Sequence, residues 1–132
     1  MNIGEASALS QVSAKMIRRY EEQGIIPKAK RSEAGYRQYS ENDVHVLKFV
    51  KRARELGFSM KDIKQLLGLW RNKNRSSSQV KTIANKHIKE LERKLSEIQS
   101  ILHTLTHLVE CCHGDNRPDC PILEELDSTT PY

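Results

Sequence analysis

Residues 79–112 read QVKTIANKHIKELERKLSEIQSILHTLTHLVECC, and this stretch decides the architecture of the chain. Two interleaved apolar series, which together we call the seam, each repeat every seven positions: Ala84, Leu91, Ile98 and Leu105, and Ile88, Leu95, Leu102 and Val109. This alternation of three and four residues is typical of a helix packed against another helix. Such a helix extends about 50 Å at about 1.5 Å per residue, more than a small domain can cover. A second copy of the chain is therefore expected to bury the seam in a homodimer.

All three cysteines of the protein lie in the segment that follows, residues 111–120, which reads CCHGDNRPDC. Cys112 occupies the next position of the seam, whereas Cys111 falls on a flanking stripe that is mostly polar. Gly114 favours the end of the helix, and the loop beyond it can bring Cys120 back towards Cys112. Without a sign of export, these cysteines indicate a reducing cytoplasm, where thiols bind metals or sense redox state.

The charge of the chain is unevenly distributed around a net +5. Residues 1–75 hold 16 basic and 8 acidic residues, a net +8, whereas residues 76–132 hold 6 and 9, a net −3. A basic, helical front half favours a nucleic-acid partner, although a solvated charged surface has the same composition. No apolar run approaches the roughly 18 residues of a membrane span, and no signal peptide is recognisable. A cytoplasmic protein with no membrane partner is therefore expected.

The front of the chain is typical of two short helices joined by a tight turn. Ser13 can cap the second of them, which runs to about Gln23 with Gly24 just past its end. Ile17 is expected to be its buried position, and its exposed side is expected to carry Lys15, Arg18, Arg19 and Tyr20. These donors could reach phosphates and base edges in a major groove. Taken alone, the pattern fits a helix-turn-helix and an ordinary helix hairpin equally well.

A small two-stranded wing is predicted next. After Pro27 come a basic segment, a turn at residues 33–35 and the sequence Tyr36-Arg37-Gln38-Tyr39. The basic and aromatic residues of a wing have no purpose in a core, so a wing beside a helix-turn-helix favours DNA binding. Two capping patterns then predict two further helices, Ser40 with Asp43 and Ser59 with Asp62. Trp70, at the end of the second, is expected to pack against the following helix.

The predicted fold class is thus all-α with a small β wing. Its expected parts are a winged helix-turn-helix DNA-binding domain (1–70), a hinge (71–78), a coiled-coil dimerisation helix (79–112), and a metal-binding loop with a short C-terminal helix (113–132).

At this point the chain resembles the MerR family of metal-responsive transcription regulators. Residues 14–24, AKMIRRYEEQG, are similar to the recognition helix of the family, residues 31–39, RSEAGYRQY, to its first wing, and residues 56–63, LGFSMKDI, to a third family stretch. Together these motifs cover nearly the whole length of the chain. Cys112, seven intervening residues, Cys120 and the following Pro-Ile-Leu are most similar to the copper-efflux regulators of the family.

The resemblance implies a homodimer joined by an antiparallel coiled coil. It implies that the dimer binds a promoter whose two recognition elements are too far apart, and that metal binding distorts the DNA so that RNA polymerase can use it. The residues that match DNA contacts of the family are Lys15, Arg18, Tyr20, Arg31, Tyr36 and Arg37, with Arg19 as a further candidate.

The candidate metal ligands are Cys112 and Cys120, and soft thiolates favour Cu(I), with Ag(I) as a chemical mimic. Divalent-ion regulators of the family resemble one another in placing an extra cysteine at the start of the long helix, where this chain has Ser77. The alternative is a Zn(II)-type regulator, because Cys111 next to Cys112 resembles the zinc-responding branch. Zinc normally takes four ligands, and Cys111, Cys112 and Cys120 could supply three of them.

Two other classes of function compete with a regulator. A thiol redox sensor or a metal-carrying interaction module would use the coiled coil and the cysteines, but it has no need for a basic wing. An enzyme is not expected, because no Ser-His-Asp set, paired acids or phosphate-binding loop accompanies a suitable fold.

Overall fold

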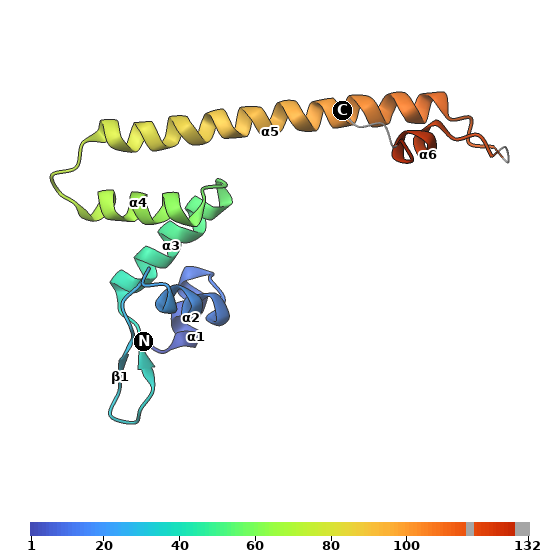
Figure 1. Ribbon diagram of the computed structural model, residues 1–132. Coiled ribbons are helices and arrows are strands. Elements are labelled where there is room, and N and C mark those ends of the chain that lie inside the picture. The colour runs from blue at the N-terminus through green and yellow to red at the C-terminus, as the bar shows by residue number, and fades with distance from the viewer. Residues whose placement is uncertain (116–117, 129–132) are drawn as a thin grey trace. The chain divides into compact units, whose positions relative to one another are not determined.

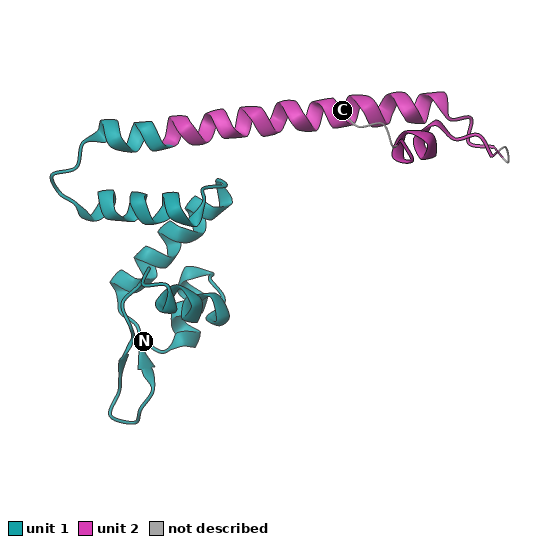
Figure 2. Ribbon diagram, in the orientation of Figure 1, with its two compact units in different colours: residues 1–83 teal, residues 84–132 magenta. Residues whose placement is uncertain are grey.

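The computed structural model describes residues 1–115 and 118–128 of the 132-residue chain. Its elements are, in chain order, α1 (Ile3–Ser10), α2 (Ala14–Glu22), β1 (Lys30–Arg31), β2 (Arg37–Gln38), α3 (Glu41–Glu55), α4 (Met60–Arg71), α5 (Ser77–Cys111) and α6 (Pro121–Leu126) (Figure 1). They form two compact units, Met1–Ile83 and Ala84–Tyr132 (Figure 2). The predicted fold class, helical with a small two-stranded wing and a long helix, is confirmed.

The predicted pair of short helices at the front of the chain is confirmed. α1 is capped by Asn2, whose side-chain oxygen accepts a hydrogen bond from the N–H of Glu5 at 2.8 Å. Gln11 ends α1 in the left-handed region, with φ of 60°. Ser13 then caps α2, and its hydroxyl accepts from the N–H of Met16 at 3.2 Å. The tight turn between the helices therefore depends on one strained residue followed at once by a cap.

The core of this unit lies where α1, α2 and α3 meet and where α4 packs against α3. Its largest fully buried side chains come from α2, from the segment that follows α2, from α3 and from α4: Ile17, Ile26, Val46, Leu47, Val50 and Ile63. Each fully buried aliphatic side chain contributes about 1.5–3 kcal/mol. These contacts fix α2 on the unit while one of its faces remains in solvent.

The wing is a two-stranded antiparallel sheet with Lys30 opposite Gln38 and Arg31 opposite Arg37. Its turn is closed by backbone hydrogen bonds from the N–H of Ser32 to the oxygen of Tyr36, 2.7 Å, and from the N–H of Gly35 to the oxygen of Ser32, 2.8 Å. Gly35 has φ of 84°, which favours glycine there. The turn predicted at residues 33–35 is confirmed.

α3 and α4 begin where their capping patterns predicted. The capping box of α3 is complete: the Ser40 hydroxyl accepts from the N–H of Asp43 at 3.1 Å, and the Asp43 carboxylate accepts from the N–H of Ser40 at 3.0 Å. Trp70 of α4 stacks on Phe49 of α3, with ring centroids 4.7 Å apart and 10° between the planes. The sequence predicted that Trp70 packs against the following helix, but its ring stacks on the preceding one.

The long helix α5 begins earlier than the predicted start at Gln79. It begins at Ser77, because the Ser76 hydroxyl accepts a hydrogen bond from the N–H of Ser78 at 3.2 Å and starts the first turn. The boundary between the two compact units falls inside this helix, after Ile83. Figure 1 shows that the chain reverses direction after α5, so that α6 does not continue the line of the long helix.

The seam of α5 is exposed in the single chain. None of the residues of α5, all of which the structure describes, is buried. Seven large seam side chains are between 43% and 60% exposed: Ile88, Leu91, Leu95, Ile98, Leu102, Leu105 and Val109. Among the described residues, no helix is both long and apolar enough to cross a membrane. A continuous apolar stripe of this length on a charged helix is an interaction surface.

Replacing Leu91 and Leu95 with alanine should prevent dimerisation through the seam. Each truncation of a buried leucine costs about 2–5 kcal/mol, and both losses occur in each copy of a symmetric dimer. Sedimentation equilibrium should show a dimer for the wild type and a monomer or an unfolded chain for Leu91→Ala/Leu95→Ala. The matched control, Lys89→Ala/Ser96→Ala, lies on the same turns but off the seam and should remain dimeric. A stable dimer of the leucine variant would contradict the seam interpretation.

Candidate DNA interface and metal centre

The solvent face of α2 carries three of the four donors that the sequence placed there. Lys15, Arg18 and Arg19 are exposed. Tyr20 is only 4% exposed and belongs to the core, so the prediction that it lies on the exposed side is wrong. The reason is helical geometry, because Tyr20 follows the fully buried Ile17 by three residues and therefore shares its face.

Two adjoining depressions lie between α2 and the wing, and the same three predicted arginines line both of them. The first, of about 310 Å³, is lined by Arg18, Glu21, Glu22, Lys28, Ala29, Arg31 and Arg37. The second, of about 350 Å³, is lined by Asn2, Ile3, Arg18, Arg31, Gly35, Tyr36 and Arg37. Cations from the helix and from both strands of the wing therefore meet on one face. Such a face suits a phosphate backbone.

The remaining predicted DNA residues lie around this face. Tyr36 is 71% exposed at the turn of the wing, and the Arg31 guanidinium donates a hydrogen bond across that turn to the oxygen of Gly35 at 2.9 Å. Lys15 and Arg19 are exposed on α2 but line neither depression. Lys28, which the sequence analysis included in the basic segment without a role, is an additional cation of the face.

Glu21 joins α2 to both sides of the wing, and sequence reasoning missed it. Its side chain is 9% exposed, and one carboxylate oxygen accepts from the N–H of Ala29, just before β1, at 2.5 Å. The other oxygen lies 3.4 Å from the Arg37 guanidinium in β2 and accepts from the Tyr39 hydroxyl, also at 3.4 Å. Its contacts thus reach both ends of the hairpin. The sequence alone does not single out Glu21, because its neighbour Glu22 on the same helix has the same side chain.

The tyrosine in this network stays protonated. Burial raises the pKa of Tyr39 above its ordinary value, and the nearby Glu21 carboxylate raises it further, while Arg37 lowers it. The phenol therefore remains a hydrogen-bond donor to Glu21 well above neutral pH. The wing is thus held to the helix by a carboxylate that accepts from the Ala29 N–H and the Tyr39 hydroxyl and pairs with the partly exposed Arg37 guanidinium.

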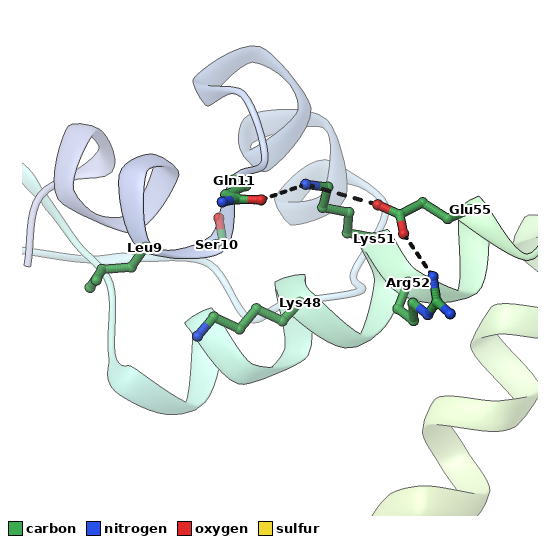
Figure 3. A pocket seen from close by; sticks show the side chains of 7 residues that line it. All are labelled: Leu9, Ser10, Gln11, Lys48, Lys51, Arg52 and Glu55. Atoms are coloured by element: carbon green, nitrogen blue, oxygen red, sulfur yellow. Dashed lines mark hydrogen bonds and ion pairs between the residues drawn. The ribbon is translucent and has the colours of Figure 1, made fainter.

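A third basic depression, of about 370 Å³, lies between α1 and α3 (Figure 3). It is lined by Leu9, Ser10, Gln11, Lys48, Lys51, Arg52 and Glu55. Two of its cations share one carboxylate: Glu55 lies 3.9 Å from the Lys51 ammonium and 3.2 Å from the Arg52 guanidinium. Lys51 also donates to the side chain of Gln11 at 3.0 Å. The two ion pairs lie within α3, and the Lys51–Gln11 hydrogen bond joins α3 to the residue that ends α1. Much of the charge here is therefore already paired within the unit.

The candidate metal ligands lie at the end of α5 and at the start of α6. Cys112 directly follows α5 and is partly exposed, and its N–H donates to the oxygens of Leu108 and Val109, both at 3.1 Å. Cys120 is the residue that precedes α6, with Pro121 at the first helical position, and is also partly exposed. Cys111 is exposed. All three cysteines are free thiols.

Within the described parts of the chain, no group of three or more His, Cys, Asp or Glu residues is close enough to hold a metal ion. A site of two thiolates needs no such group. Ser77, the predicted selectivity residue, is the exposed first residue of α5.

A winged helix-turn-helix with converging arginines and an exposed coiled-coil seam defines a DNA-binding transcription regulator. The comparison with known families agrees: residues 1–69 match the MerR HTH family regulatory protein model, and residues 44–108 match the model named MerR, DNA binding. The chain belongs to the MerR family of transcription regulators, and it is not an enzyme. MerR-family regulators bind promoter DNA as dimers and contact RNA polymerase.

Individual relatives cover nearly the whole chain. The heavy metal-dependent transcription regulator 2 of Rhizobium meliloti is 60% identical over 126 residues, which are 96% of this chain and 86% of the relative. The regulator CueR of Vibrio cholerae is 41% identical over 96% of this chain and 91% of its own length. Among solved structures, PbrR691 of Ralstonia metallidurans in complex with lead(II) has a TM-score of 0.83 at 28% identity, covering 96% of this chain and 98% of that one.

Glu21→Gln should weaken operator binding, because the amide loses its charge-assisted bonds and leaves the wing less firmly held to α2. The expected loss of stability is about 1 kcal/mol. The matched control is the exposed neighbour Glu22, whose replacement by glutamine removes the same charge without loosening the wing. Electrostatics alone would make both variants bind DNA more tightly, since each removes a negative charge from the interface. Operator binding can be measured by fluorescence anisotropy. If Glu21→Gln binds the operator as tightly as Glu22→Gln, Glu21 does not hold the wing in its DNA-binding position.

Proposed function

We propose that this chain is a Cu(I)-responsive transcription activator, with Ag(I) acting as a mimic, and that Cys112 and Cys120 hold the ion. The coarser description, a MerR-type heavy-metal-dependent transcription regulator, is the one that its relatives share. The single observation that carries the finer proposal is the donor set: two free, partly exposed thiols at the two ends of one loop. The 41% identity to CueR supports it.

The chemistry of two thiols fits a soft monovalent ion. Thiolates prefer soft ions such as Cu(I), whereas zinc normally takes four ligands in a tetrahedron. Two thiolates carry two negative charges, so a monovalent ion leaves the site at −1, and a divalent ion would be neutralised but left short of ligands. The heptad positions of the two neighbouring cysteines also support Cys112 as the ligand, because Cys112 continues the seam and Cys111 does not.

The rest of the chain supplies DNA binding. Two copies joined by an antiparallel coiled coil through the seam would bind the two elements of a promoter in the cytoplasm. Metal binding would then distort the DNA so that RNA polymerase can use it. The residues proposed to contact DNA are Lys15, Arg18, Arg19, Arg31, Tyr36 and Arg37. Tyr20, which the resemblance adds as a seventh candidate, is only 4% exposed.

A Zn(II)-type regulator that uses Cys111, Cys112 and Cys120 is the alternative, and it makes a different demand on Cys111. Under the Cu(I) proposal, Cys112→Ser and Cys120→Ser each abolish the response to Cu(I) while operator binding is kept. Cys111→Ser keeps most of the response and serves as the matched control, since it removes the same sulfur one residue away. A promoter-reporter assay with graded Cu(I) and Zn(II) measures both. If Cys111→Ser responds as poorly as Cys112→Ser, the Zn(II)-type site is the better description.

Ser77 is proposed to contribute to metal choice by withholding a ligand. In an antiparallel dimer, the start of one long helix lies near the end of the other, so Ser77 would approach the Cys112 loop of the second copy. A neutral hydroxyl is a poor ligand for a soft ion and adds no charge to the site. A relative with a third thiolate there could complete the shell of a divalent ion.

Ser77→Cys should therefore gain Zn(II) affinity of about tenfold or more while keeping some affinity for Cu(I). Competition with a chromophoric chelator on the reduced dimer measures the gain. Ser78→Cys is the control, because it adds the same thiol to the next exposed position of the same turn. Equal Zn(II) affinities for the wild type and Ser77→Cys, or equal gains for the two variants, would contradict the selectivity role.

A further inference from the structure

α2 ends in a Schellman motif, a cap in which two backbone N–H groups reach back to the last turn of the helix. Gly24 takes the left-handed conformation, with φ of 75°, and its N–H donates to the oxygen of Glu21 at 3.2 Å. The N–H of Ile25 donates to the oxygen of Tyr20 at 2.9 Å, which completes the motif. Ile25 is 2% exposed, so its own carbonyl group also needs a hydrogen-bond partner within the unit.

Arg71, the last residue of α4, supplies that partner from 46 positions later in the chain. Its Nη2 atom donates a hydrogen bond to the oxygen of Ile25 at 3.3 Å. Arg71 follows Leu67 by four residues and Ile63 by eight, so it ends the row of side chains that α4 buries. Although Arg71 as a whole is exposed, its place on the helix thus brings its stem beside the core and its guanidinium to the cap of α2.

The charge of Arg71 suits the place that it reaches. The last carbonyl groups of a helix carry a partial negative charge that favours a cation. The sequence of α2 ends in Glu21 and Glu22, which add further negative charge at the same end. The Arg71 guanidinium brings a positive charge to this end from another helix. Its hydrogen bond is also stronger than one from a neutral donor.

The C-terminal end of α2 therefore has two anchors. Glu21 joins it to the wing, and Arg71 joins its cap to α4. α4 is the last helix before α5, which carries the seam. In a dimer formed through that seam, the separation of the two copies of α2 depends on how firmly each is held to its own α4.

We infer that Arg71 is a positioning residue for DNA recognition, which sets the half-site spacing that the dimer accepts by holding the cap of α2 to the end of α4. MerR-family regulators bind promoter DNA as dimers. Each base pair added between two half-sites moves them about 3.4 Å apart and rotates them by about 35°. A firmly held α2 discriminates between operators that differ by one base pair in spacing, whereas a loosely held α2 accepts both. This role goes beyond the proposed function, because it concerns the geometry of the DNA and needs no metal ion.

The test uses the full-length, metal-free dimer and an operator that the wild-type protein selects from random-sequence DNA. Two further duplexes carry the same half-sites one base pair closer together and one base pair farther apart. Arg71→Met removes the hydrogen bond and the charge but keeps an apolar stem on α4. Fluorescence anisotropy gives the Kd for each duplex, and the ratio of Kd between an altered and the selected operator should fall by about threefold or more in Arg71→Met, as the loss of one hydrogen bond allows.

Lys73→Met is the matched control, because it makes the same change at an exposed cation two residues later, and it should keep the wild-type ratio. The inference is overturned if Arg71→Met weakens binding to all three operators by one factor, which is the effect of a smaller folded fraction. It is also overturned if Arg71→Met binds all three as the wild type does, or if Lys73→Met changes the ratio as much. Because no metal is present, none of these results bears on the Cu(I) proposal.

Discussion

The structure depends on one constraint: α5 has an apolar seam that a single chain leaves open. Seven large seam side chains are about half exposed, and at about 25 cal/mol per Å² the burial of such a surface against a partner releases a large free energy. The stability of the long helix is therefore tied to association, and it depends on protein concentration. The DNA-binding unit has its own buried core, formed by α1 to α4. It is therefore the seam of α5 that needs a second chain to bury it.

In the DNA-binding unit, a carboxylate holds together a surface that is otherwise positive. Glu21 lies among Arg18, Lys28, Arg31 and Arg37, and a negative charge there opposes an approaching phosphate. The structure nevertheless buries it and directs Ala29, Arg37 and Tyr39 onto its two oxygens. The electrostatic cost at the DNA face is offset by the fixed orientation of the wing relative to α2. A rigid pair of reading elements loses less entropy on binding than a loose pair.

Much of the fold could be predicted from the sequence, because its signals are local. Capping at Ser13, Ser40 and Ser59 sets the starts of α2, α3 and α4, and the seven-residue repeat identifies the long helix α5. The prediction failed where tertiary contacts decide. Tyr20 has a polar tip but follows Ile17 by one turn, so it is buried. Glu21 could not be assigned, because its partners lie 8 to 18 residues away across the wing. The convergence of the arginines likewise follows from the packing of the wing on α2.

The stack of Trp70 on Phe49 has a practical consequence. The chain has one tryptophan, so its tryptophan fluorescence comes from a single place, the contact between α3 and α4. This ring is 42% exposed, and its emission is therefore sensitive both to water and to the neighbouring ring. α4 is the last element before the long helix, so any rearrangement there would change an optical signal already present in the chain. The molecule thus carries a built-in optical probe of the contact between α3 and α4.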